Sequence, residues 1–305
     1  MNLSLLKLRY FVTTAEEGSI TAAAQRLHIS QPSISAAISQ LEDSLKLPLF
    51  IRKSSSGLLL TPGGQQILSK ARALLAHANE FQTTASTLNS ELSGRIRVAC
   101  FVNLAPLHFA SLLAKFKEKF PYIEVDFYDR DQSEIFEGIR NAKYELALTF
   151  DLGEPNEFDE FSVIVVAKIP PHAILAKNHR LAKQKSVSLK ELLPEPLILM
   201  DLPHSREYLL SLFSFLNLHP NLKYLPRSFE MVRALAGNGL GYGLLGLVPQ
   251  TTSTYDGSQV VSLPIKESVR HLNMIVIQLK QMPTRQVVET FALFIENYFK
   301  EQKSH

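Results

Sequence analysis

Residues 19–45 read SITAAAQRLHISQPSISAAISQLEDSL, and this stretch decides the fold of the N-terminal part of the chain. Its first half predicts a short helix with a small, close-packing alanine face, and the hydroxyl of Ser19 or Thr21 supplies the N-cap. The helical pattern ends at His28. Ser30 can then cap a second helix that carries Pro32 in its first turn, where a missing N–H costs nothing. The stretch therefore predicts two short helices joined by a tight turn.

The second helix has two different faces. One is apolar, with a spacing of 4, 3 and 4 residues between Ile34, Ile38, Leu41 and Leu45. The opposite face is small, polar and almost uncharged, and consists of Pro32, Ser35, Ala36, Ser39 and Gln40. A helix that had only to keep a protein soluble would carry more Lys and Glu. The pattern favours a DNA-reading helix-turn-helix, and an ordinary helical hairpin is the alternative.

Charge alone does not point to nucleic acid. The chain has 305 residues, 46% apolar and 20% charged, with a net charge of +3, as expected for a globular protein of two or three domains. Residues 1–62 hold six Lys or Arg against four Asp or Glu, a net of +2. A strongly basic footprint is absent. The helical motif itself therefore carries the prediction of DNA binding.

Other features of the sequence predict where in the cell the protein is found. A single cysteine, Cys100, excludes an intramolecular disulfide. The N-terminus lacks a basic segment followed by an apolar run, so no signal peptide is predicted. No apolar stretch is long enough to span a membrane, and a membrane is not expected among the partners. These features predict a cytoplasmic protein.

A wing follows the two helices. Residues 49–52 and 58–61 are extended runs, and the Ser- and Gly-rich residues between them form the tip of a hairpin. Arg52 and Lys53 would lie along the phosphates or enter the minor groove, which adds affinity rather than sequence information. The alternative is that both are merely solvated loop charges.

A long helix is predicted from about Pro62 to Leu92. Its apolar seam has an unbroken spacing of 4 and 3 residues and comprises Ile67, Ala71, Leu74, Ala78, Phe81, Ala85, Leu88 and Leu92. A helix of this length cannot bury the seam against its own small domain. We expect it to pair with a second copy of itself through Leu74, Ala78, Phe81 and Leu88. The alternative is a buried helix within one large domain.

From Gly94 onwards strands alternate with helices, which predicts an α/β region with a mostly parallel, open sheet. A crossing near residues 165–170 and a return near 266–272 divide it into two lobes. The predicted domains are a winged helix-turn-helix at 1–62, a linker helix at 63–93 and an α/β domain at 94–305. Lobe 1 covers about 94–167 and 270–305, and lobe 2 about 168–269.

The N-terminal region resembles the LysR-type transcriptional regulators. The matching residues, at family spacing, are Leu8-Arg9-Tyr10-Phe11, Gly18-Ser19-Ile20, Ala23-Ala24, Leu27, Ser30-Gln31-Pro32-Ser33-Ile34-Ser35, Ile38, Leu41-Glu42, Leu47-Pro48-Leu49-Phe50, Arg52 and Thr61. The resemblance implies DNA contacts from Thr21, Gln31, Pro32, Ser33, Ser35, Ala36, Arg52 and Lys53. The family often carries a basic residue where Ala36 stands and longer polar side chains at Ala37 and Ser39. Specificity here therefore leans on the wing and on DNA bending.

The same resemblance implies a bilobal effector domain like a periplasmic binding protein, with a small molecule in the cleft. It also implies an antiparallel dimer, the pairing of dimers into a tetramer, and RNA polymerase as a partner. In open α/β sheets ligands bind beyond the carboxyl ends of strands. We therefore expect effector contacts from Phe101, Val102, Asn103, Thr149, Phe150, Asp201, His204, Ser205, Phe229 and Tyr242.

Acidic side chains near these strand ends set the expected ligand chemistry. Asp151, Asp201 and Glu230 would make the cleft acidic, which favours an effector with an amine, amide or ring nitrogen. The alternative for Asn103, Ser205 and Ser228 is that they are plain N-caps. Cys100 is interpreted as a small core residue. Gly237, Gly239 and Gly241 follow a helix rather than open one, so they predict a turn and close strand packing, not a phosphate loop.

Other classes of protein are disfavoured. No metal-ligand cluster, Gly-x-Ser-x-Gly motif or recognisable carboxylate pair is present, so we predict no catalytic residues, no metal and no cofactor. A transport-type binding protein conflicts with the N-terminal helix-turn-helix. Non-specific DNA packaging conflicts with the low charge and the large α/β domain. The sequence therefore predicts a DNA-binding regulator that responds to a small molecule.

Overall fold

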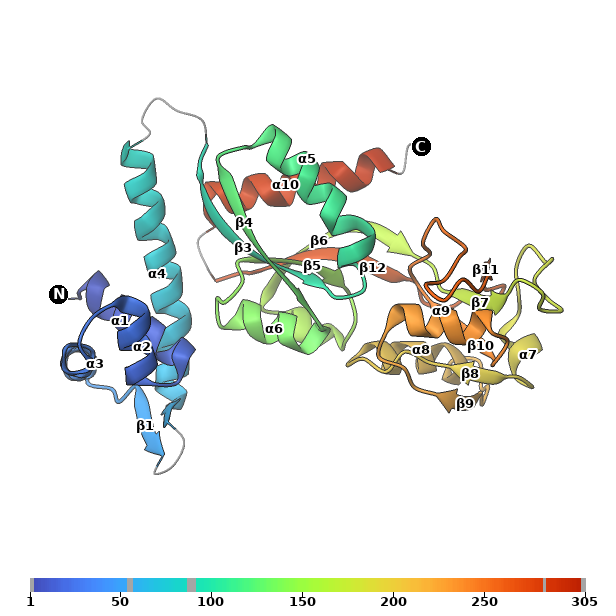
Figure 1. Cartoon of the computed structure of the whole chain (residues 1–305), viewed down its shortest axis with the longest axis horizontal. Helices are drawn as coiled ribbons and strands as arrows, with labels where there is room; N and C mark the ends of the chain where they lie inside the picture. The colour runs from blue at the N-terminus through green and yellow to red at the C-terminus, as the bar shows by residue number, and fades with distance from the viewer. Residues whose placement is uncertain (1–2, 54–56, 87–91, 282–283, 303–305) are drawn as a thin grey trace.

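The computed structural model describes residues 3–53, 57–86, 92–281 and 284–302. Three parts follow one another along the long axis of the molecule (Figure 1): a helical N-terminal domain, the long helix α4 (Pro62–Ser86) and two α/β lobes. None of the helices in these ranges is both long and apolar enough to cross a membrane.

The N-terminal domain consists of α1 (Leu5–Glu17), α2 (Ile20–Leu27) and α3 (Gln31–Leu45). Of the two predicted caps for α2, Ser19 is the one used, because its Oγ accepts from Ala22 N at 3.4 Å. Ser30 Oγ accepts from Ser33 N at 3.3 Å and caps α3. His28, in the left-handed region at φ 55°, ends α2. Local capping thus forms the tight turn between the two helices.

The wing consists of strands β1 (Phe50–Lys53) and β2 (Gly57–Leu60), which pair antiparallel. Glu42 Oε1 on α3 accepts from Leu49 N at 2.7 Å and Phe50 N at 3.3 Å. On the other side Leu58 N donates to Gly18 O at 2.9 Å. These bonds hold the wing at a fixed position beside α3.

Helix α4 begins at a cap and then packs on the N-terminal domain. Thr61 Oγ1 accepts from Gly64 N at 2.8 Å and donates to Pro48 O at 2.7 Å. Ile67 and Ala71 pack against the core that contains Phe11. The first two positions of the predicted seam are therefore covered by the chain's own domain. The predicted helix extended to Leu92, and residues 87–91, with Leu88, lie outside the described residues.

Lobe 1 contains a five-stranded sheet in the order β4-β3-β5-β12-β6. Its strands are β3 (Gly94–Phe101), β4 (Ile123–Arg130), β5 (Leu146–Phe150), β6 (Phe161–Ile169) and β12 (Leu272–Leu279). Helices α5 (Ala110–Lys119) and α10 (Gln286–Gln302) cover one face, and α6 (Gln132–Arg140) lies on the other (Figure 1). A π-helical turn, η1 (Ala105–Phe109), precedes α5, and a 3-10 turn, η2 (Pro155–Phe158), precedes β6.

Lobe 2 contains a second five-stranded sheet in the order β11-β7-β10-β8-β9. Its strands are β7 (His172–Ala176), β8 (Pro196–Ile198), β9 (Asn221–Tyr224), β10 (Tyr242–Leu245) and β11 (Val260–Pro264). Helices α7 (Leu189–Leu192), α8 (Ser205–Ser214) and α9 (Phe229–Gly237) pack around it.

Among the described residues, each sheet has four strands that run in one direction and one that runs the opposite way, so the expectation of a mostly parallel sheet is confirmed, with β12 and β7 as the exceptions. Strand β12 runs antiparallel to β5 and β6, and β7 runs antiparallel to β10 and β11. Strand β3 is parallel to β4 and β5, and β8 is parallel to β9 and β10. In each sheet the strand of opposite direction is the first one after a crossing between the lobes, β7 after the first crossing and β12 after the second.

Candidate functional site

The N-terminal end of α3 presents the small polar surface that the sequence predicts. Gln31, Pro32, Ser33 and Ala36 are exposed, and Ser35 is half-buried. Thr21 on α2 is also exposed and lines a shallow depression together with Gln31. Ser33 Oγ lies 2.7 Å from Ser30 Oγ, so it takes part in the helix cap.

Few free charges accompany this surface. Arg26 on α2 lies 2.8 Å from Glu17 and 3.2 Å from Glu16. Its hydrogen bond to Glu17 raises the pKa of the guanidinium. Arg52 and Lys53 belong to β1, and their side chains lie outside the described part of the structure.

Helix α4 leaves an apolar stripe open beyond the N-terminal domain. Phe81 is 77% exposed and Leu74 is 42% exposed, and Ala78 between them is half-buried. An exposed phenylalanine and leucine on one helix face are typical of a surface that another chain covers.

One residue that links the domains was missed in the sequence. Arg72 on α4 is only 8% exposed; its Nη1 donates to Asn141 O at 2.8 Å and its Nη2 lies 3.4 Å from Glu16 Oε1. It therefore joins the N-terminal domain to the C-terminal end of α6 in lobe 1. The signal in the sequence is a lone arginine within the apolar run ARALLA at residues 71–76.

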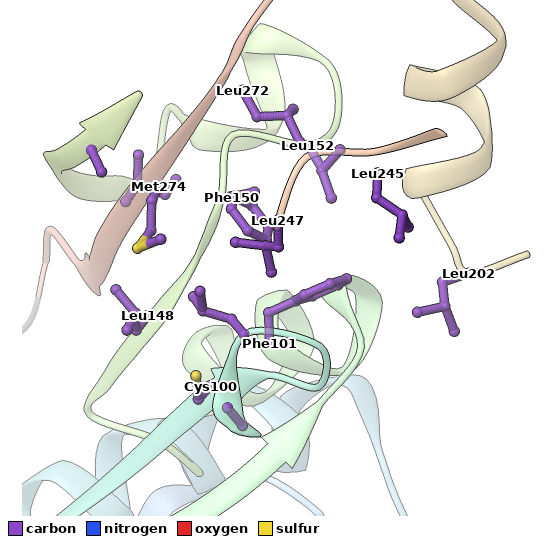
Figure 2. Packing of buried hydrophobic residues seen from close by; sticks show 14 of the residues in the cluster. Cys100, Phe101, Leu148, Phe150, Leu152, Leu202, Leu245, Leu247, Leu272 and Met274 are labelled. Carbon is purple, nitrogen blue, oxygen red and sulfur yellow. The ribbon is translucent and has the colours of Figure 1, made fainter. Parts of the chain in front are cut away.

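A cleft lies where the two lobes meet. Its walls are mainly apolar and consist of Phe101, Asn103, Phe150, Leu152, Met200, Ser205, Tyr208, Leu209, Phe229, Leu244, Leu245, Gly246, Leu247 and Leu272. Figure 2 shows how Phe101, Phe150 and Leu247 crowd together. The rings of Phe101 and Phe150 meet edge to face with centroids 5.5 Å apart. The cavity measures about 40 Å³.

Half of the predicted effector residues line this cleft, namely Phe101, Asn103, Phe150, Ser205 and Phe229. The other half lie beside it and are Val102, Thr149, Asp201, His204 and Tyr242. Thr149 is fully buried and donates to Gln132 Oε1. Tyr242 is fully buried as well, and its Oη has no hydrogen-bond partner among the described residues.

His204 sits at the contact between the lobes instead of in the cavity. Its Nδ1 lies 3.9 Å from Glu157 Oε2. Its ring and that of Phe136 meet edge to face, with centroids 6.0 Å apart. Both of these partners belong to lobe 1, whereas His204 precedes α8 in lobe 2. It thus belongs to the interface that holds the lobes together.

Two predicted caps are wrong. Asn103 does not cap a helix; its Nδ2 donates to Met200 Sδ at 2.9 Å, across the cleft. Ser205 is the first residue of α8, and His204, at φ 62°, occupies the cap position. Ser205 is 3% exposed, and its Oγ has no partner within the described structure. Ser228 is a cap as proposed, because it accepts from Met231 N at 3.4 Å.

The expected acidic cleft is also wrong. Asp151 accepts from Asn273 N at 2.6 Å and Nδ2 at 2.7 Å. Asp201 pairs with Arg206 at 3.1 Å, and Glu230 pairs with Arg233 at 2.6 Å. None of the three carboxylates lines the cavity. Each is paired with a donor of the protein that does not line the cavity either.

The remaining predictions concern residues outside the cavity. Cys100 is fully buried, and burial raises the pKa of its thiol, which confirms its interpretation as a core residue. Gly241 packs so tightly that a Cβ would lie 2.1 Å from Pro196 O, as close strand packing requires. No group of three or more His, Cys, Asp or Glu in the described ranges could hold a metal ion.

Comparisons with known proteins agree with this architecture. The model of the bacterial regulatory helix-turn-helix protein, lysR family, matches residues 5–65, and that of the LysR substrate binding domain matches residues 89–300. YvbU, an uncharacterized HTH-type transcriptional regulator of Bacillus subtilis, is 31% identical over 65% of this chain and 66% of its own.

Solved structures are similar over nearly the whole length. HinK, a LysR family transcriptional regulator from Pseudomonas aeruginosa, is 35% identical, with a TM-score of 0.64 over 98% of this chain and 99% of its own. A full-length OxyR variant from the same organism shares the fold, with a TM-score of 0.75 at 21% identity over 97% and 98% of the two chains. Because the two family models together cover most of the sequence, the chain belongs to the LysR family of bacterial transcriptional regulators.

Proposed function

We propose that this protein binds specific DNA through α3 and the wing, and that a small-molecule effector bound between its two lobes changes this activity. Members of its family are DNA-binding transcription regulators with an effector-binding domain, not enzymes. The observation that carries the effector site is the hydrogen bond from Asn103 in lobe 1 to Met200 in lobe 2, inside the cleft. A molecule that enters there must change how the lobes meet.

The proposed reading of DNA rests on a few short side chains. Gln31 would contact adenine through N6 and N7, and Pro32 and Ala36 would contact thymine methyl groups. Thr21, Ser33 and Ser35 would contact nearby bases and phosphates. Arg52 and Lys53 in the wing would add phosphate contacts, which position the protein without reading sequence.

The exposed stripe of Leu74, Ala78 and Phe81 supports a dimer, in which the predicted seam continues to Leu88. Two recognition helices on one body require two half-sites at a fixed spacing. In our proposal two dimers pair into a tetramer in the bacterial cytoplasm. Closure of the lobes then changes the DNA bend and the access of RNA polymerase, which requires different effector affinities for the two arrangements.

Fluorescence anisotropy tests the proposal. The full-length protein is titrated onto a labelled duplex from upstream of its own gene and onto a scrambled duplex of equal length, across a salt series. Preference for the upstream duplex at physiological salt is the expected result. Equal binding that disappears with salt would mean that only phosphates are contacted, and would contradict the proposed reading of sequence.

A further inference from the structure

No charged side chain of the described residues lines the cleft between the lobes. Among the described residues that line it, only Asn103, Ser205 and Tyr208 have polar side chains, and the rest of the wall is apolar apart from the backbone of Gly246. The phenylalanine rings come from Phe101 and Phe150 in lobe 1 and from Phe229 in lobe 2. A ligand bound in the cleft would therefore contact mainly apolar side chains.

Charges close to the cleft are already neutralised by the protein. The Asp151 carboxylate accepts two hydrogen bonds from Asn273 and lies 3.7 Å from the Arg270 guanidinium. The carboxylate of Asp201 is paired with Arg206. A charged ligand would therefore lose its water without gaining an opposite charge, and such burial is strongly unfavourable.

Two polar side chains that line the cleft lack a good hydrogen-bond partner among the described residues. Ser205 Oγ, at the start of α8, is buried without a hydrogen bond in the described structure. Asn103 Nδ2 has only the thioether of Met200, a weak acceptor. Tyr208 Oη, in contrast, donates to Arg270 O at 2.9 Å, and burial raises its pKa, so it stays a neutral phenol. Ser205 Oγ and Asn103 Nδ2 are therefore the two donors in the wall that a ligand could engage.

We propose that the effector is an uncharged, mainly apolar molecule about the size of one aromatic ring, with a single hydrogen-bond acceptor such as a carbonyl. The acceptor receives hydrogen bonds from Ser205 Oγ and Asn103 Nδ2, and the ring packs among the phenylalanines. This inference rests on the proposed function, since it names the chemical class of effector for the same cleft. It replaces the nitrogen-bearing effector that the acidic residues had suggested.

The size of the cavity links this ligand to the conformation of the lobes. A cavity of about 40 Å³ is far smaller than the ~300–1,000 Å³ of ordinary ligand pockets. A ring can therefore enter only when side chains move and the bond from Asn103 to Met200 is broken. Because Asn103 and Met200 belong to different lobes, occupancy of the cleft and the arrangement of the lobes are coupled.

Four probes of nearly equal size separate charge from shape: acetophenone, benzoate, benzylamine and ethylbenzene. Each is titrated into the full-length protein labelled with ¹³C at its methionine methyl groups. Met200 lies in the cleft, whereas Met231 is 49% exposed on α9 and serves as an internal control. A change in the chemical shift of the Met200 methyl group without a change in that of Met231 locates binding in the cleft.

Acetophenone is expected to shift Met200 with an affinity at least tenfold higher than that of benzoate or benzylamine. Its advantage over ethylbenzene, about fivefold for each added hydrogen bond, should shrink in Ser205→Ala and in Asn103→Leu and disappear when both substitutions are combined. Ser214→Ala lies on the same helix outside the cleft wall and should keep this advantage.

If benzoate or benzylamine shifted the Met200 signal with an affinity equal to that of acetophenone, the proposal of an uncharged effector would be overturned. The cleft would then remain the proposed effector site. A Met200 signal that none of the four probes moves would overturn the proposal as well. In either case, anisotropy of the same sample on the labelled duplexes tests separately whether the protein binds specific DNA, as the proposed function requires.

Discussion

The guanidinium of Arg72 on α4 donates to the carbonyl oxygen of Asn141, at the end of α6, at 2.8 Å. The same side chain reaches Glu16 on α1, 3.4 Å away. One buried cation therefore touches the N-terminal domain, the linker helix and lobe 1. A helix C-terminus is a favourable place for a positive charge, because its carbonyl groups carry partial negative charge.

Arg72→Ala should reduce the free energy of unfolding by about 1.5–3 kcal/mol, the usual contribution of a hydrogen bond to a charged group. The Asn141 carbonyl and Glu16 would lose a partner that is largely shielded from water. Urea unfolding followed by circular dichroism measures the change. Lys70→Ala, an exposed position on the same helix, should stay within about 0.5 kcal/mol of the wild type. Equal effects of the two substitutions would contradict the role of Arg72.

Glu42 fixes the wing to α3 through the N–H groups of Leu49 and Phe50. Glu42→Ala leaves the N–H of the buried Leu49 without its acceptor and should cost about 1–3 kcal/mol of stability. Asp43→Ala removes an exposed carboxylate from the neighbouring position and serves as the control. Thermal unfolding compares the two variants, and unchanged stability of Glu42→Ala would show that the wing is held by other contacts.

Gln31→Ala should weaken binding by about 1–3 kcal/mol at one base position of the operator, because a two-bond contact with adenine is lost. Anisotropy on a set of single-base operator variants measures this. Gln66→Ala, at an exposed position on α4, should bind every duplex like the wild type. An equal loss on all sequences would mean that Gln31 contacts the backbone of DNA and does not read a base.

Phe81→Glu should break the dimer, since it places a charge on the most exposed residue of the apolar stripe. Analytical ultracentrifugation at micromolar concentration reports the species present. Gln66→Glu adds the same charge to an exposed position of the same helix and should leave the dimer intact. A Phe81→Glu variant that still sediments as a dimer would refute pairing through this stripe.

Acid should destabilise the protein partly through His108. Burial lowers the pKa of His108 and of His172 below the ordinary value of 6.5. Well above pH 6.5 both imidazoles are neutral in the folded and unfolded states. As the pH falls below 6.5, the unfolded chain binds protons that the folded chain resists, so stability is lost.

His108→Gln should therefore reduce the fall in melting temperature between pH 7.5 and pH 5.5. The exposed His219 provides the matched control, His219→Gln, whose pH dependence should follow the wild type. An identical fall in both variants would mean that other groups control the loss of stability in acid.

Local patterns in the sequence determined the parts of this protein that depend on near neighbours. The spacing of Ile34, Ile38 and Leu41 predicted a helix with one buried face, and all three are buried. Ser30 and Ser228 were predicted as caps, and each accepts a hydrogen bond from a backbone N–H three residues later. Such interactions require only the adjacent chain, so a single sequence contains the information.

The tertiary structure alone decided what Asn103, Ser205 and Arg72 do. Asn103 lies 97 positions from Met200, and Arg72 lies 69 positions from Asn141. Side chains that look like caps in sequence became the polar groups of a cleft, because the second lobe removed them from water. Of the nearby acids, Asp151 accepts from Asn273, 122 positions away, whereas Asp201 and Glu230 pair with the local Arg206 and Arg233. Burial and long-range pairing depend on which distant segments meet, and residue spacing along the chain does not specify that.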